Sequence, residues 1–220
     1  PTQQAAQWLA QLAAALGQRD INAALALFVD DSYWRDLVSW TWNIKTMEGK
    51  DAIRKMLEAR LADTTLSNFV LEGEATEADG VTEGWFTFET AVARGRGHLR
   101  LKDGKGWTLL TTMTELKGFE ERKGEHRVKG AEHGVQKGRK SWLEKREEEA
   151  KALGTTEQPY VVIVGGGQGG IALGARLRRL GVPTIIIEKN EKPGDSWRRR
   201  YKSLCLHDPV WYDHLPYLPF

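Results

Sequence analysis

The sequence predicts two folded units of different class: an α+β unit over residues 1–117 and the beginning of an α/β unit over residues 157–220. Three observations lead to this prediction. In the first half, apolar residues at helical spacing give way to apolar residues that alternate, as they do in antiparallel strands. A connector over residues 118–156 then has few apolar residues and is roughly half charged. After it, a continuous apolar run leads into a glycine-rich loop, which is typical of a buried parallel strand.

Two short amphipathic helices open the chain. Residues 4–16 place apolar side chains at helical spacing, and Asp20 is a suitable N-cap for a second helix that reaches Phe28. The aromatic stretch over residues 34–44 alternates toward its end and predicts a strand. A third helix is expected to begin at Asp51, so the predicted order is helix, helix, strand, helix.

Antiparallel strands are predicted in the rest of this unit. The pairs Asp79-Gly80 and Asp103-Gly104 favour tight hairpin turns between them. Helices packed on one face of a curved antiparallel sheet form an α+β domain. The predicted strands are Phe69–Glu74, Val81–Arg94, Gly97–Lys102 and Trp107–Leu116.

Three stretches of this unit resemble a known fold family. They are Phe28-Val29-Asp30-Asp31, Tyr33-Trp34-Arg35-Asp36 and Glu48-Gly49-Lys50-Asp51-Ala52-Ile53. With the element order, they resemble the nuclear transport factor 2-like fold, including its polyketide-cyclase-like (SnoaL-like) branch, over about residues 5–117. The resemblance implies a cone-shaped α+β domain. Family members use the mouth of the cone for ligands, catalysis or dimer contacts, so a homodimer through this domain is one implied role among several.

One set of acidic and histidine side chains in this unit allows two interpretations. Asp30, Asp31, Asp36, Glu89 and His98 could supply an acid–base pair that lines a pocket in the cone. Alternatively, Asp30 and Asp31 end the second helix, and His98, which alternates with apolar neighbours, faces solvent. We favour the second interpretation.

The connector predicts one helix and no metal site. Residues 141–153 are rich in Glu, Lys and Arg and predict a solvated helix that Trp142 docks to a neighbour. A basic arm that binds a partner is the alternative, but the acids cancel the bases. His126 and His133 have no cysteine or acidic partners at ligand spacing, so we expect no metal.

Composition excludes several classes of protein. A formal net charge of +2 gives no large field that would attract nucleic acid or an acidic membrane. Cys205 is the single cysteine, which excludes an internal disulfide, and it is interpreted as a buried apolar residue rather than a reactive nucleophile. No apolar run approaches the roughly 20 residues that span a bilayer, and the start lacks a signal peptide, so we expect a soluble, cytoplasmic protein. The apolar end, Leu218-Pro219-Phe220, leads us to expect a truncated chain.

The motif most informative about chemistry begins the second unit. Residues 160–164 predict a buried parallel strand, and it leads straight into a loop in which Gly165, Gly167 and Gly170 satisfy G-x-G-x-x-G. These glycines allow a tight turn, a bare backbone against a pyrophosphate, and close contact between helix and strand. The loop is therefore interpreted as part of a dinucleotide-binding site.

The residues after the loop complete a βαβ pattern. A helix over residues 171–180 would present its N-terminal amides to the phosphates, and Gly181 ends it. Glu188 follows a second strand, residues 184–187, and is placed to accept hydrogen bonds from ribose hydroxyls and to repel a 2′-phosphate. FAD and NAD share this fingerprint, so the motif alone leaves the choice between them open.

The residues that follow resemble a family of flavoenzymes. Residues 192–201 include Gly194 and Trp197 in a Gly-x-x-Trp segment that resembles the one along the flavin of flavin-containing and Baeyer–Villiger monooxygenases. Residues 201–220, with a Leu-x-Leu-His step that ends at His207, look most like plant auxin-synthesising flavin monooxygenases and their microbial relatives. The resemblance implies the N-terminal part of a Rossmann-type FAD-binding domain. The expected cofactor-binding residues are Gly165, Gly167, Gln168, Gly170, Glu188, Lys189, Trp197 and His207.

Two features of this segment each allow two interpretations. His207 is either a functional histidine near the flavin or a structural histidine bonded to backbone. Residues 198–200 are either a solvated basic turn or a source of one contact to the phosphates of FAD or of the nicotinamide cofactor.

The resemblance also implies an activity for the complete protein. It would bind FAD, take a hydride from NADPH in preference to NADH, and oxygenate a small organic substrate through a flavin hydroperoxide. The catalytic residues and the substrate are not identified. The first alternative is an FAD- or NAD-dependent reductase without oxygenation. The second is a ligand-binding or dimerisation module that carries a vestigial dinucleotide-binding tail.

Overall fold

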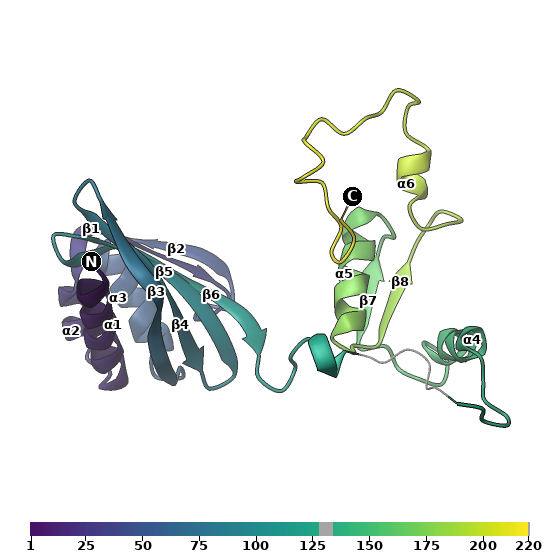
Figure 1. Cartoon of the computed structure of the whole chain (residues 1–220), viewed down its shortest axis with the longest axis horizontal. Helices are drawn as coiled ribbons and strands as arrows, with labels where there is room; N and C mark the ends of the chain where they lie inside the picture. The colour runs from purple at the N-terminus through teal and green to yellow at the C-terminus, as the bar shows by residue number, and fades with distance from the viewer. Residues whose placement is uncertain (128–133, 220) are drawn as a thin grey trace. The chain divides into compact units, whose positions relative to one another are not determined.

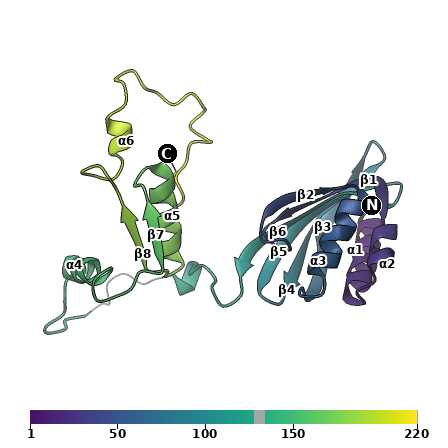
Figure 2. The same cartoon turned by 180° about the vertical axis from the view of Figure 1, so that it is seen from behind.

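The chain divides into two compact units in a computed structural model (Figures 1 and 2). The structure describes residues 1–127 and 134–219, so His133 lies outside the described residues. The first unit spans Pro1–Glu120, and the second begins at Glu121.

Three helices cover one face of a six-stranded mixed sheet in the first unit (Figures 1 and 2). The strand order is β2-β1-β6-β5-β4-β3, and every neighbouring pair is antiparallel except β1 with β6, which is parallel. This is an α+β fold, as the sequence predicts. The helices are α1 (Thr2–Gly17), α2 (Ile21–Ala26) and α3 (Gly49–Arg60). The strands are β1 (Phe28–Leu37), β2 (Ile44–Glu48), β3 (Leu66–Ala78), β4 (Val81–Thr90), β5 (Ala93–Lys102) and β6 (Lys105–Leu116).

The helices and the sheet enclose an aromatic core. Phe28, Trp34, Trp40 and Phe86 are almost completely buried, and side chains along β4 and β5 alternate between this core and the outer face of the sheet. Glycine makes room for the rings, because a Cβ on Gly97 would lie 2.1 Å from Cζ of Phe86. Packed aromatic side chains therefore occupy the interior between the helices and the sheet.

Local signals in the sequence place several elements correctly. The carboxylate of Asp20 caps α2, because it accepts a hydrogen bond from the backbone N–H of Ala23 at 2.9 Å. Both predicted Asp-Gly turns, 79–80 and 103–104, have positive φ at the two residues, as type I′ hairpin turns require. These predictions are confirmed.

Two predictions about strand boundaries are wrong. Asp30 and Asp31 do not end α2, because β1 begins at Phe28 and both residues lie within that strand. The strand predicted over residues 81–94 is two strands, since the chain turns after Thr90, whose hydroxyl accepts backbone hydrogen bonds within the turn.

A buried carboxylate interrupts the strand predicted over residues 34–44. Asp36 is fully buried in β1, where an ionisable group must be surrounded by hydrogen-bond donors. These bonds fold residues 38–43 into a loop, and β2 begins only after it. The donors are the backbone N–H groups of Trp40 and Thr41 and the hydroxyls of Ser39, Thr41 and Thr111.

The second unit contains two parallel strands joined through a helix. β7 (Val161–Val164) pairs with β8 (Thr184–Ile187), and α5 (Gln168–Arg179) lies between them in sequence. The burial predicted for β7 is wrong: β7 has one neighbouring strand, and Ile163 is the single buried residue of the four. This unit also includes η1 (Gly124–His126), α4 (Trp142–Ala152) and α6 (Asp195–Arg198).

The solvated helix predicted in the connector is α4. It begins with a capping box formed by Ser141 and Glu144 and has no buried residue. Trp142 does not dock it, because this side chain is exposed and the Arg146 guanidinium lies 5.2 Å from its ring centroid. Among the helices that the structure describes, none has the length and apolar character needed to cross a lipid bilayer.

A buried glutamate joins three segments of the second unit. The Glu121 carboxylate pairs with Arg176, with Arg179 at 3.2 Å and with Lys123 at 3.3 Å. Arg176 also donates a hydrogen bond to the Tyr217 hydroxyl at 2.8 Å. Burial acts to raise the pKa of Glu121, but hydrogen bonds from Tyr217 and the three cations outweigh it and lower this pKa to about 2.

The lowered pKa predicts that Glu121 stabilises the second unit in a pH-dependent way. Because the folded-state pKa, about 2, lies below the ordinary 4.5, the stabilisation is fully present above pH 4.5 and is lost as the pH falls toward 2. Glu121→Gln should therefore lower the urea midpoint of the α5 amide NMR signals more at about pH 6 than at about pH 3. Glu125→Gln, which alters an exposed acid of the same segment, is the control. An equal loss at both pH values would contradict this assignment.

Candidate dinucleotide-binding site

The glycine-rich loop joins the carboxyl end of β7 to α5. Gly165 makes the turn with φ +108°, a conformation that residues with a side chain rarely adopt. Its N–H donates to the carbonyl oxygen of Ile187 at 2.7 Å, so the turn lies beside the end of β8. The loop is thus located at the carboxyl ends of both parallel strands, the edge at which α/β sheets bind ligands.

Two glycines let α5 pack directly on its neighbours. A Cβ on Gly170 would lie 1.9 Å from the carbonyl oxygen of Gly165. A Cβ on Gly174 would lie 2.7 Å from Cδ1 of Ile186 in β8. A side chain at Gly170 would force the helix or the loop backbone to move, whereas one at Gly174 would displace the end of the Ile186 side chain. Gly174 was not among the predicted residues, although its signal in the sequence is a second glycine one helical turn after Gly170.

Gly167 has no comparable reason within the protein to be glycine. Its φ of −74° and ψ of −173° suit any residue, and a Cβ there would meet only the Ser196 hydroxyl oxygen, at an ordinary 3.7 Å. Gly167 is the N-cap of α5, no side chain caps this helix, and Gln168 after it is exposed. The first-turn amides of α5, which have no partner within a helix, therefore adjoin a stretch of bare backbone.

Glu188 ties the end of β8 to the glycine loop. Its Oε2 accepts a hydrogen bond from the N–H of Gly166 at 2.5 Å, and its Oε1 accepts from the backbone N–H and Nδ2 of Asn190 at 2.8 and 2.6 Å. The backbone hydrogen bonds from Asn190 and Gly166 lower the pKa of Glu188 below its ordinary value. The carboxylate is therefore an ionised acceptor at neutral pH. Asn190 was not predicted, and its local signal is only that it follows Glu188 by two residues.

The Gly-x-x-Trp segment contacts the same loop. The N–H of Gly194 donates to the carbonyl oxygen of Gly166 at 3.1 Å, and α6 begins at the next residue. Asp195 is buried and pairs with Arg198 at 2.8 Å, so Arg198 has a structural partner that the sequence did not indicate. Trp197 is 40% exposed. Its ring surface is therefore accessible on a helix that is hydrogen-bonded to the loop.

Not every predicted residue lies at the loop. Lys189 and His207 are exposed, and within the described ranges no hydrogen bond or ion pair joins His207 to the loop. Cys205, which was predicted to be buried, is exposed because few side chains beyond α6 are buried. The predicted residues that the structure does bring together are Gly165, Gly167, Gln168, Gly170 and Glu188, with Trp197 held nearby through α6.

The acidic and histidine residues of the first unit do not form an acid–base pair. Asp30 and Glu89 each pair with a lysine, at 2.8 and 2.7 Å, and Asp36 is fully hydrogen-bonded in the interior. His98 is only partly exposed to solvent, because its ring packs against Trp85, with 4.6 Å between the two ring centroids. Across residues 1–127 and 134–219, no group of three or more His, Cys, Asp or Glu side chains is placed to hold a metal ion.

Short stretches of the chain are similar to curated monooxygenases and oxidoreductases. "Indole-3-pyruvate monooxygenase YUCCA1" of Oryza sativa subsp. japonica is 43% identical over 63 residues, which cover 28% of this chain and 16% of that protein. "Uncharacterized oxidoreductase CzcO-like" of Geobacillus kaustophilus is 39% identical over 56 residues, which cover 26% of this chain and 16% of that protein. The chain thus spans a small part of the length of the relatives it matches. No family model matches it.

Solved structures align with about half of the chain at low TM-scores. An orange carotenoid protein of Anabaena that binds canthaxanthin is 22% identical, with 49% of this chain and 35% of that chain covered and a TM-score of 0.40. A cystatin-like domain of unknown function from Nostoc punctiforme is 11% identical, with 50% and 74% covered and a TM-score of 0.42. An NTF2-like protein of unknown function from Cytophaga hutchinsonii is 13% identical, with 49% and 87% covered and a TM-score of 0.35. At these scores the likeness does not bear on function.

The contact between α5 and its loop predicts a strong effect of one methyl group. Gly170→Ala should lower the free energy of local opening of α5 by about 2 kcal/mol, because the added Cβ overlaps the Gly165 carbonyl oxygen. Hydrogen exchange of peptides from α5, followed by mass spectrometry, measures this change. Gly169→Ala is the matched control, since a Cβ there meets no atom within 4 Å. Equal protection of α5 in the two variants would refute the packing role of Gly170.

Proposed function

We propose that the second unit binds FAD and that the protein is a flavin-dependent monooxygenase. The observation that carries the proposal is Gly167, because neither the packing of the protein nor the backbone conformation at this position requires a glycine. A ligand that must approach the backbone closely would require a glycine here, and the adjoining N-terminus of the helix favours an anion. A pyrophosphate meets both requirements.

The residues at the loop fit the adenosine half of the cofactor. The first-turn amides of α5, from Gln168 onward, would hold the pyrophosphate, and the ionised carboxylate of Glu188 would accept hydrogen bonds from ribose hydroxyls. Glu188 is already fixed by its hydrogen bonds to Gly166 and Asn190, so its orientation need not be created when the cofactor binds.

The segment after β8 favours FAD over NAD. Gly194 joins α6 to the glycine loop, and the ring of Trp197 on α6 stays partly exposed. An aromatic surface held at the loop suits a flavin, which is itself a large planar ring. The relatives with local similarity include proteins named as indole-3-pyruvate monooxygenases, which supports the same choice.

The proposed reaction follows from the cofactor. Bound FAD supplies redox chemistry, with NADPH as the reductant and oxygen as the co-substrate, and a small organic molecule is oxygenated. In this chain, the proposed work of Gly167, Glu188 and Trp197 is to bind and orient the cofactor.

One substitution separates cofactor binding from folding. Gly167→Ala should leave the hydrogen-exchange protection of α5 unchanged, because a Cβ there meets only an ordinary contact. It should nevertheless weaken FAD retention by at least about tenfold, since the methyl group would occupy the position of the pyrophosphate. Gly17→Ala, which adds a Cβ in open space in the first unit, is the control. Retention of FAD by Gly167→Ala at the wild-type level would overturn the proposed site.

Oxygen stoichiometry tests the reaction class. Protein expressed from its complete reading frame is reduced with NADPH in air, and oxygen uptake, hydrogen peroxide and products from a panel of small organic compounds are measured. An oxygenated product formed in step with NADPH oxidation supports a monooxygenase. Complete recovery of the consumed oxygen as hydrogen peroxide with every compound would contradict it and would support a reductase.

A further inference from the structure

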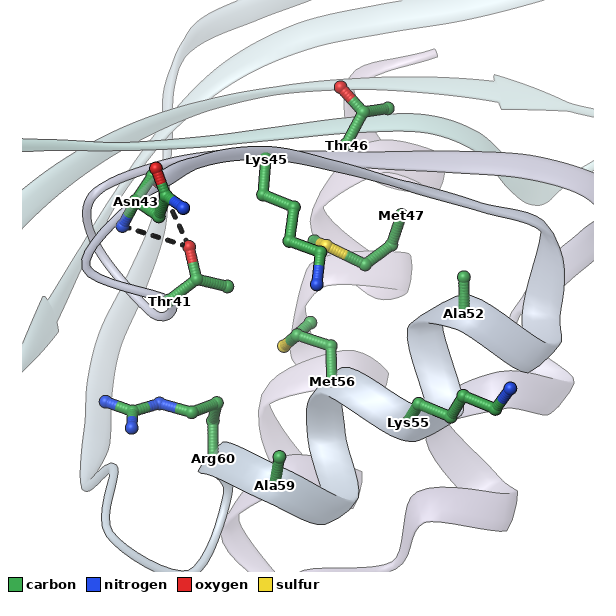
Figure 3. Close-up of a pocket in the computed structure, with 10 residues that line it drawn as sticks. All are labelled: Thr41, Asn43, Lys45, Thr46, Met47, Ala52, Lys55, Met56, Ala59 and Arg60. Carbon is green, nitrogen blue, oxygen red and sulfur yellow. Dashed lines mark hydrogen bonds between the residues drawn. The ribbon is translucent and has the colours of Figure 1, made fainter.

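A hollow of about 370 Å³ lies between α3, β2 and the loop over residues 38–43 in the first unit (Figure 3). Its volume lies toward the small end of the range for pockets that bind small molecules. The hollow borders the core at one edge: Met47 and Met56, which line it, are buried core residues, whereas the buried rings of Phe28, Trp34 and Phe86 do not line it.

The floor of the hollow is apolar. Met47 on β2 and Met56 on α3 lie in the middle of it, and Ala52 and Ala59 lie along the same helix (Figure 3). Methionine side chains adapt to the shape of a ligand, and alanines leave room for one. An apolar group of a few carbon atoms could therefore be covered here.

The rim of the hollow is cationic. Lys45 reaches down from β2 toward Met56, while Lys55 and Arg60 lie at opposite ends of the hollow and extend away from the two methionines (Figure 3). Among the residues that the structure describes, no acidic side chain lines the hollow. In the part of the chain that the structure describes, neither lysine forms an ion pair, so three positive charges share this rim without a counter-ion from the protein.

One cation of the rim is already held in place. Nε of Arg60 donates a hydrogen bond to the carbonyl oxygen of Trp40 at 2.8 Å, which anchors the guanidinium on the loop beside the hollow. Its two terminal nitrogens form no ion pair with any described acid. A guanidinium fixed at one edge presents its other donors in the planar arrangement that matches a carboxylate.

We propose that this hollow binds a small organic anion: a carboxylate attached to an aromatic or aliphatic body. The cationic rim would hold the carboxylate, and the body would cover the two methionines. A neutral apolar molecule would leave the three cations uncompensated, and an inorganic anion would leave the floor uncovered. This site goes beyond the proposed flavin chemistry and does not depend on it.

The three methionines of the chain provide a site-specific test. Met47 and Met56 line the hollow, whereas Met113 lies on β6 and does not. Full-chain protein labelled with [methyl-¹³C]methionine is titrated with 3-phenylpropanoate and, separately, with its neutral counterpart 3-phenylpropanamide. We expect 3-phenylpropanoate to shift the methyl signals of Met47 and Met56 saturably, with Met113 unchanged. The amide should bind at least about tenfold more weakly, because it has no charge for the rim.

Paired variants test the charge requirement. The double substitution Lys45→Gln, Lys55→Gln should weaken 3-phenylpropanoate binding by about threefold for each lysine removed. Lys102→Gln, Lys105→Gln, which removes two exposed lysines outside the hollow, should change it little. The proposal is overturned if the methyl signals of Met47 and Met56 do not move, if Met113 moves with them, if the amide binds equally well, or if the two double variants behave alike.

Discussion

Direct packing of α5 on the backbone of its own preceding loop is the constraint on which the second unit depends. Gly170 leaves no gap for a Cβ against the Gly165 carbonyl, so the start of the helix is fixed at the carboxyl ends of both strands. Gly166 adds two further ties, because it donates to Glu188 and accepts from Gly194. One short loop thereby holds the end of β8 and the starts of α5 and α6 beside the same backbone amides. Gly167, the glycine that this packing does not require, is the one most informative about a ligand.

Two of the buried carboxylates, Asp36 and Glu121, each organise the segments around them. Asp36 draws the backbone and hydroxyl donors of residues 38–43 around itself, and that loop in turn presents the Trp40 carbonyl to Arg60. The hydrogen bonds of this buried side chain thus help to position a cation at the rim of the hollow. Glu121 gathers three cations and a tyrosine in the second unit. Each carboxylate is committed to its partners, which disfavours either as an acid or base for a substrate.

Much of the framework follows from local sequence signals. Asp20, the two Asp-Gly turns and the apolar spacing of α1 locate their elements because each acts through residues close in sequence. The glycine fingerprint likewise places the loop between β7 and α5. The interruption at residues 38–43 has no such local signal, because it depends on Asp36 and on Thr111, which is distant in sequence. The hollow also has no local signal, because its lysines come from separate elements.

Errors of burial have a common physical origin. Trp142 and Cys205 were expected to be covered because of their residue types, but exposure depends on which segments pack beside them. In β7, a run of apolar residues predicted a parallel strand correctly and its burial incorrectly, since burial requires neighbours on both sides. Asn190 and Asp195 were missed as supports of the site, because their contacts to Glu188 and Arg198 are details of turn geometry.

The central claim is that the loop from Gly165 to Gly170 and the carboxylate of Glu188 hold FAD. The most direct test is the visible absorbance spectrum of the protein purified from its complete reading frame, with the mass of any released cofactor determined. The account predicts yellow protein that releases FAD in nearly equal amount. Colourless protein that takes up no FAD on reconstitution would contradict the account and would move the search for function to the first unit.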